Sequence, residues 1–200
     1  MPRIIQEYRE EVGKKIVEAA YSHFLQKGYH GTTMSDIAKS LGVTKPALYQ
    51  YFSGKVDLYA AVAEHSREEL ATILERSFNK RDIRSGSEVL FDTLAQFAPQ
   101  FNSMYSEIVM LAIHNERIHT LLCQDMIAHI HVVERFIARQ QERGLISGQL
   151  DPHVLAIACD ALINGLFIDI MAGMDKEEAK KIWIATVTQL IQTDEKKRNF

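Results

Sequence analysis

Apolar residues recur three and four positions apart through most of this 200-residue sequence, the spacing that places side chains on one face of a helix. Helix start and stop signals interrupt the pattern at intervals of roughly ten to twenty residues. Four prolines and ten glycines are too few for a chain built mainly of turns, and no alternation typical of strands competes with the helical pattern. The sequence therefore predicts an all-α fold of about nine helices.

Residues that begin and end helices give approximate boundaries. Thr33 with Asp36 three positions later has the spacing of a capping box, and Thr44 is suited to cap the following helix. The polar segment 79–88, "NKRDIRSGSE", is predicted to be a loop, and Pro99 to stop a helix. The last seven residues, "DEKKRNF", are expected to be frayed. The predicted helices span residues 9–27, 33–41, 44–52, 55–78, 86–100, 103–115, 118–143, 152–172 and 175–192.

Charge is distributed unevenly along the chain. The net charge is -3, but residues 1–60 hold eight Lys/Arg against six Asp/Glu, so a mildly basic N-terminal piece precedes an acidic remainder. This asymmetry permits an anionic partner at the N-terminal end. Two cysteines, Cys123 and Cys159, lie in apolar helical patterns and form no disulfide framework. Together with a start that lacks the apolar core of a signal peptide, they indicate a cytoplasmic protein with inert, reduced cysteines.

The segment Val154–Met174 is apolar for about the length of a membrane span. It contains Asp160, Asn164 and Asp169, and two central aspartates are costly in lipid. Flanking basic clusters and aromatic anchors are missing as well. We therefore expect a helix buried inside protein and no membrane partner.

Residues 33–55 have the layout of a helix-turn-helix: a helix of about eight residues, a turn containing Gly42, and a second helix of about nine residues. Leu48 and Phe52 lie four positions apart and are expected to face inward. Ile37, Ala38 and Leu41 of the first helix are expected to pack against Val43, Leu48 and Phe52. The residues left toward solvent are Lys45, Pro46, Ala47, Tyr49 and Gln50, with Tyr51 at the edge. Pro46 falls in the first turn after Thr44, where its missing N–H costs no helical bond.

A solvent-facing helix N-terminus with lysine, glutamine and tyrosine suits DNA. The first residues of a recognition helix enter the major groove while neighbouring groups contact phosphate. Lysine bonds guanine edges or phosphate, and tyrosine hydroxyls donate to phosphate oxygens. A helical hairpin whose polar face is merely solvated has the same local pattern, so this pattern leaves both interpretations open.

The segment Phe24–Val62, "FLQKGYHGTTMSDIAKSLGVTKPALYQYFSGKVDLYAAV", resembles the DNA-binding segment of TetR-family transcriptional regulators. The shared features are Phe24, Gly28, Thr33, the run "DIA..LGV" and the run "LYQYF..K..L", which together span about a fifth of the chain. The resemblance implies a DNA-binding domain at residues 1–54 and an effector-binding and dimerisation domain at residues 55–200. No comparable signature follows Val62.

The resemblance also implies roles for individual residues. Thr33 and Ser35 match positions that contact phosphate or an adjacent base, and Lys55 matches a lysine that contacts phosphate. Many relatives carry glycine within the pair that is Pro46–Ala47 here, so the base contacts are expected to differ. With Gln50 added from its exposed position, the predicted DNA-binding residues are Thr33, Ser35, Lys45, Pro46, Ala47, Tyr49, Gln50, Tyr51 and Lys55.

A stripe of small residues on the helix predicted at residues 152–172 would let another helix approach closely. Ala158, Ala161, Gly165 and Ala172 fall within about 60° of one another around the helix axis. Packing within the same chain explains such a stripe equally well, but TetR-family resemblance implies that the last two helices form a homodimer interface. Compatible spacing in the final helix adds Ala179, Ile182, Trp183, Thr186 and Leu190.

The opposite side of the same helix holds Asp160, Asn164, Phe167 and Met171, polar groups among apolar ones. Such a face fits either a hydrogen-bonded core pair or a ligand pocket with a few orienting groups. In TetR-like proteins this region encloses an effector pocket, so we expect a small, largely apolar effector. Other candidate lining residues are Met104, Tyr105, Ile108, Leu111, His114 and Met126.

These expectations combine into a ligand-responsive DNA-binding regulator, a homodimeric repressor released from a palindromic operator in double-stranded DNA by its effector. No enzyme, cofactor or metal site is expected. Neither the pair His114 and His119 nor the pair His129 and His131 has the spacing that puts two ligands on one helix face. A helical protein that binds lipid or small molecules, or an adaptor without DNA binding, is the alternative function.

Overall fold

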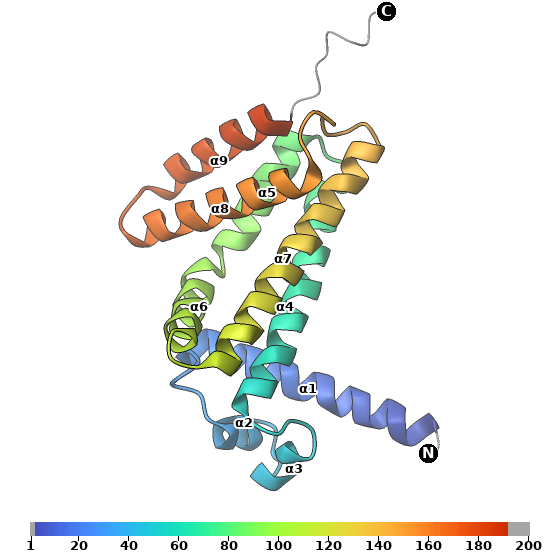
Figure 1. Ribbon diagram of the computed structural model, residues 1–200, viewed down its shortest axis with the longest axis vertical. Coiled ribbons are helices and arrows are strands. Elements are labelled where there is room, and N and C mark those ends of the chain that lie inside the picture. The colour runs from blue at the N-terminus through green and yellow to red at the C-terminus, as the bar shows by residue number, and fades with distance from the viewer. Residues whose placement is uncertain (1–2, 192–200) are drawn as a thin grey trace, which may run out of the picture. The chain divides into compact units, whose positions relative to one another are not determined.

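The computed structural model describes residues 3–191; Met1, Pro2 and residues 192–200, which include the tail predicted to be frayed, lie outside the described part. All regular structure in residues 3–191 is α-helical, and the nine helices found there confirm the predicted fold class (Figure 1). The helices are α1 Arg3–Lys27, α2 Met34–Ser40, α3 Lys45–Tyr49, α4 Lys55–Phe78, α5 Ile83–Ala95, α6 Ala98–Ala112, α7 Glu116–Glu142, α8 Pro152–Met171 and α9 Lys176–Ile191.

The chain divides into two compact units. Unit 1 comprises residues 1–66 and 100–125, and unit 2 comprises residues 67–99 and 126–200. Helices α4, α6 and α7 each contribute residues to both units. The units therefore do not follow the predicted division at residue 54, and that division stays a prediction about function.

Unit 1 is built around a single hydrophobic cluster. Phe24 of α1, Leu48 of α3 and Leu58 of α4 are fully buried in it. Met104 and Ile108 of α6 belong to the same cluster, so the helix-turn-helix region shares its core with a helix distant in sequence. An ion pair also connects the start of α7 to α4: the guanidinium of Arg117 pairs with the carboxylate of Asp57.

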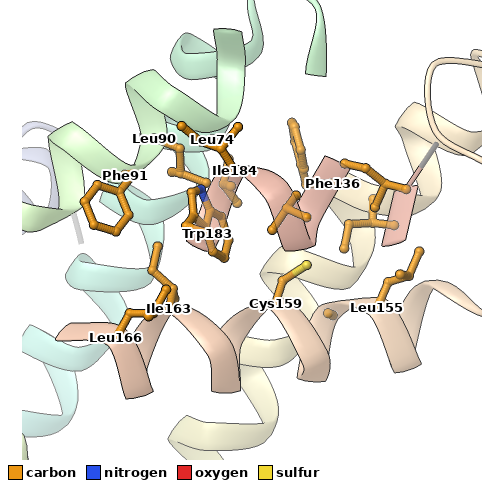
Figure 2. Close-up of a cluster of buried hydrophobic side chains, with 14 of the residues drawn as sticks. Leu74, Leu90, Phe91, Phe136, Leu155, Cys159, Ile163, Leu166, Trp183 and Ile184 are labelled. Carbon is orange, nitrogen blue, oxygen red and sulfur yellow. The ribbon is translucent and has the colours of Figure 1, made fainter. Parts of the chain in front are cut away.

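Unit 2 has its own core, to which α5, α8 and α9 each contribute. Figure 2 shows Trp183 of α9 facing Ile163 of α8, with Phe91 of α5 beside them. The ring of Phe91 also packs on Phe167, with ring centroids 5.4 Å apart. The indole N–H of Trp183 donates to the carbonyl of Ser87 at 3.0 Å, so the largest side chain of α9 is fixed to α5.

Two predicted boundaries are wrong. Residues 79–88 are not one loop, because Asp82 caps α5 by accepting from the backbone N–H of Ser85 at 2.8 Å, and the helix begins at Ile83. Pro99 does not stop a helix; it lies in the first turn of α6, where a missing N–H leaves no bond unmade. In the first place a polar stretch, and in the second a single proline, marks the start of a helix.

The packing at the start of α5 leaves room only for glycine at position 86. A Cβ at this position would overlap the ring of Phe78, which is itself packed against Phe136 with centroids 5.2 Å apart. We expect Gly86→Ala to lower the free energy of unfolding by about 1–3 kcal/mol through overpacking, against the helix propensity gain of about 1 kcal/mol that alanine normally brings. Denaturant unfolding measures the change.

Gly13→Ala in α1 is the matched control, because a Cβ there meets nothing within 4 Å. Gly13→Ala should keep or raise the stability. Equal stabilisation by both substitutions would contradict the packing of Gly86 against Phe78.

Helix α8 is the one described helix that is long and apolar enough to cross a membrane by length and composition. Its inner face is buried in the core of unit 2 through residues such as Leu155, Cys159 and Leu166. Its other face is exposed, so the expectation of a fully buried helix holds for only one side. This exposed face bears on the assembly considered below.

Candidate DNA-binding interface

The first helix of the predicted motif begins with the capping box expected from its sequence. The Thr33 hydroxyl accepts from the backbone N–H of Asp36 at 3.1 Å, and the Asp36 carboxylate accepts from the backbone N–H of Thr33 at 3.0 Å. The Thr33 hydroxyl also lies 2.6 Å from the Asp36 carboxylate and donates to it, and this bond, followed by the one from the Thr33 backbone N–H, holds the pKa of Asp36 below its usual value. Ser35 is exposed in the same first turn, beside the exposed Thr33.

The turn between α2 and α3 depends on Gly42, whose φ of +68° is in the left-handed region. With the chain turned this way, the N–H of Val43 bonds the carbonyl of Ala38 at 3.0 Å. Val43 itself is exposed rather than packed inward, which corrects its predicted packing against the first helix of the motif. The turn is short because Gly42 follows the end of α2 and Thr44 is already the N-cap of α3.

Helix α3 begins as predicted and ends earlier. The Thr44 hydroxyl accepts from the N–H of Ala47 at 3.4 Å, and Pro46 occupies the first turn. Regular helix stops at Tyr49 instead of continuing to Phe52, because the N–H of Gln50 turns to the carbonyl of Ala47. The recognition helix is therefore only five residues long.

The two faces of α3 differ as the motif requires. Leu48 is its only buried residue and points into the core of unit 1. Lys45, Pro46, Tyr49 and Gln50 are exposed, while Ala47 and Tyr51 are half-buried. The ammonium of Lys45 lies 5.9 Å from the centroid of the Tyr49 ring. An exposed cation and aromatic at the helix N-terminus form the surface that a major groove would meet.

Lys55, predicted to contact phosphate, makes intramolecular bonds in the structure. Its ammonium donates to the carbonyls of Tyr29 at 2.8 Å and Thr32 at 3.0 Å, and lies 4.2 Å from the centroid of the Tyr29 ring. Burial lowers the pKa of the lysine, and the nearby carboxylate of Glu107 opposes that shift. Lys55 therefore fixes the loop that leads into α2, and its predicted DNA contact stays a prediction.

The other side of this loop is held by α6. The carboxylate of Glu107 accepts from the backbone N–H of His30 at 2.7 Å. It also lies where a side chain at residue 28 would be, and Gly28 has a φ of +73°. The loop from α1 to α2 is thus bound between a carboxylate of α6 and an ammonium of α4, which sets the position of Thr33.

Comparison with known proteins agrees with this geometry. Residues 16–62 match the family model described as bacterial regulatory proteins, tetR family. The transcriptional activator FasR of Mycolicibacterium smegmatis is 35% identical over 89 residues, which is 42% of this chain and 41% of FasR. The transcriptional regulator TtgR of Pseudomonas putida is 26% identical over 218 residues, covering 96% of this chain and 97% of TtgR.

Residues 16–62 therefore carry the DNA-binding domain of TetR-family transcriptional regulators. Solved structures share the fold of this chain: a protein from Rhodococcus sp. described as a TetR-family regulator superposes with a TM-score of 0.74 at 20% identity, covering 92% of this chain and 100% of that one. A SmeT–triclosan complex gives a TM-score of 0.64 at 19% identity, covering 92% of each chain. The chain spans less than half of FasR and nearly all of TtgR.

Helices α8 and α9 lie side by side (Figure 1), and apolar residues remain exposed on their outer sides. We call the exposed residues Val154, Ile157, Ala161 and Ile168, with the half-exposed Gly165, the α8 face. Val154 and Ile168 are 53% and 59% exposed, and exposed apolar residues gathered on one face mark an interaction surface. Two residues of the predicted small-residue stripe, Ala161 and Gly165, belong to this face, and the larger apolar residues on it were not predicted.

The prediction that Ala179 and Trp183 lie in the dimer interface is wrong. Ala179 is fully buried and Trp183 nearly so in the core of unit 2, so neither presents surface to a second chain. Spacing alone could not separate the two sides of α9, because an apolar residue, Ile182, also lies on its exposed side. Ile182 is exposed, and Thr186 and Leu190 are half-buried; Ala158 is half-buried and Ala172 is exposed at the end of α8.

The predicted effector-binding residues fall in both units. In unit 1, Met104 and Ile108 are buried in the core, Tyr105 and Leu111 are half-buried, and His114 is exposed. In unit 2, Phe167 is buried, Asp160 and Asn164 are half-buried, and Met126 and Met171 are exposed. Their effector role stays a prediction.

His129, considered above only for a metal site, contacts Asp160, one of these residues. His129 Nε2 lies 2.8 Å from one carboxylate oxygen of Asp160, and the side-chain amide of Asn164 donates to the other at 3.0 Å. His129 is 31 positions from Asp160, on α7 rather than α8. No local pattern could have found this pairing.

The two lysines at the interface should behave differently on substitution. Lys55→Met should weaken binding to all DNA sequences and lower the free energy of unfolding by about 2 kcal/mol, because two bonds from a charged donor are lost. Lys45→Ala should leave stability unchanged and relax discrimination at one operator position, because this exposed lysine makes no described bond to the protein backbone. Denaturant unfolding and titrations on operator and random DNA measure both. Equal losses on the two DNAs for both variants would contradict the assignment.

Proposed function

We propose that this chain is a cytoplasmic homodimeric repressor that binds a palindromic operator and leaves it when a small, largely apolar effector binds. The observation that carries the proposal is the two-sided recognition helix, with Leu48 buried beneath and Lys45 and Tyr49 exposed above. Such a helix serves to present side chains to a groove. FasR, which is named an activator, is similar to less than half of this chain. The reporter experiment tests whether this chain represses or activates transcription.

The α8 face supports the homodimer. A helix of 20 residues whose inner side is in the core and whose outer side is aliphatic is unfavourable in water unless the outer side is covered. Small residues at positions 161 and 165 would let the same helix of a second copy approach closely. A dimer with two-fold symmetry presents two recognition helices to successive major grooves, which is the arrangement that a palindromic operator requires.

The pairing of His129, Asp160 and Asn164 supports an effector site within unit 2. These groups are half-buried beside apolar residues such as Phe167, and an apolar pocket with a few fixed polar groups is the usual form of a small-molecule site. SmeT, which has this fold, is known in complex with triclosan. A small aromatic molecule is therefore the class of effector that we propose.

The mechanism is a shift between two dimer geometries. An effector that binds better to the geometry in which the recognition helices no longer match successive grooves lowers operator affinity. By linkage, operator DNA lowers effector affinity by the same factor.

Release by a small molecule is tested with a reporter gene placed behind an operator recovered by selection. The proposal expects the protein to repress the reporter, and expects one or more members of a panel of small aromatic compounds, beginning with triclosan, to restore expression. Each active compound should raise the melting temperature of the protein and weaken operator binding in a purified system. Binding of such a compound with unchanged operator affinity would refute the ligand-released mechanism, and raised expression by the protein alone would show an activator.

A further inference from the structure

The N-terminal helix reaches the far end of the recognition helix through one side chain. The guanidinium of Arg9 in α1 donates through Nη2 to the backbone carbonyl of Gln50 at 2.9 Å, across 41 positions of sequence. The same guanidinium lies 5.6 Å from the centroid of the Tyr51 ring. One side chain thus contacts both residues that immediately follow α3.

The end of α3 needs such a contact because the helix is so short. Five residues form little more than one turn, and a helix of this length does not hold itself together in water. Leu48 is the only residue of α3 that is buried in the core, so the helix itself has a single inner anchor. Gln50 is the C-cap, and its carbonyl belongs to the end of the helix where acceptors lack helical partners and a cation is favourable.

We propose that Arg9 is a positioning residue that fixes the orientation of the recognition helix, and thereby sets sequence discrimination without contacting a base. The rigid planar guanidinium suits the task, because it donates to a carbonyl while its face lies against an aromatic ring. A lysine would keep the charge and lose this geometry. With Leu48 below and Arg9 at the C-terminal end, α3 presents Lys45 and Tyr49 at one angle.

The competing role for an exposed arginine on α1 is a direct phosphate contact, and the two roles predict different measurements. A phosphate contact contributes equally to operator and random DNA, its loss lowers the slope of log affinity against log salt by about 1, and lysine restores it. A positioning role contributes to operator binding alone, leaves the salt slope unchanged, and is not restored by lysine.

The experiment measures affinities of full-length wild type, Arg9→Ala and Arg9→Lys for a selected operator and for random duplex DNA over a salt series. The proposal expects both variants to lose about tenfold in operator affinity, the size of one lost base contact, with unchanged affinity for random DNA and an unchanged salt slope. Equal losses on the two DNAs, or full rescue by lysine, would overturn it.

Two controls separate this outcome from loss of fold and from loss of charge. Lys14→Ala removes one positive charge from an exposed position of the same helix and should keep the ratio of operator to random affinity. Thermal unfolding monitors each variant, and Arg9→Lys carries the test alone if Arg9→Ala does not fold. The inference rests on the DNA-binding part of the proposed function. Wild type that selects no DNA would refute that function, whereas a selective wild type with equally selective Arg9 variants refutes only the role of Arg9.

Discussion

Leu48→Ala is expected to abolish operator binding and to lower the free energy of unfolding by about 2–5 kcal/mol, the usual cost of a leucine deleted from a core. Leu48 is fully buried and is the only buried residue of α3, so its truncation leaves a cavity in unit 1 and removes the inner anchor of the recognition helix. Denaturant unfolding gives the stability, and a mobility-shift titration at a temperature where the variant is still folded gives the affinity.

Val43→Ala is the control for Leu48→Ala. Val43 lies in the same turn-and-helix segment but is 43% exposed, so its truncation should change the free energy of unfolding by less than about 0.5 kcal/mol. If the variant at position 48 unfolded like wild type and still bound the operator, α3 would not be the element that presents the DNA-binding surface.

Gly165→Leu is expected to convert the protein to monomers at low micromolar concentration and to reduce operator affinity by at least about a hundredfold, because a lone protomer reads only one half-site. A Cβ at Gly165 meets nothing within 4 Å in the protomer, so the protomer accommodates a larger side chain. The same side chain would stand on the α8 face and keep a second helix at a distance. Analytical ultracentrifugation measures the assembly.

Gly13→Leu is the matched control for the effect on assembly, because its Cβ position is equally open and lies on α1. It should leave the sedimentation of the protein unchanged. A Gly165→Leu protein that remained fully dimeric at low concentration would contradict the assignment of the α8 face to the dimer.

Local chemistry was predictable from the sequence. The capping box of Thr33 and Asp36, the cap at Thr44 and the place of Pro46 in a first turn all depend on residues within a few positions of one another. The same local reasoning failed at residues 79–88, where a polar composition with Gly86 indicated a loop. In that segment Asp82 is a cap, and the glycine is there because of Phe78.

Contacts between distant residues were not predictable in this way. Spacing could not separate the two sides of α9; the burial of Trp183 and its bond to α5 show which side belongs to the protomer's own core. Lys55 has the position of a phosphate contact, yet its ammonium bonds two carbonyls of the preceding loop. Arg9 has no signal in the sequence that connects it with Gln50, because a side chain's reach across 41 positions depends on how α1 and α3 are packed.

The central claim, that this chain reads a palindrome as a dimer through α3, is tested most directly by selecting bound duplexes from a random DNA pool. The account predicts enrichment of one inverted repeat whose half-site centres are about one helical turn, or a multiple of it, apart. It also predicts that Lys45→Ala changes one base preference symmetrically in both half-sites. No enrichment, or enrichment of a single asymmetric site that Lys45→Ala leaves unaltered, would contradict it.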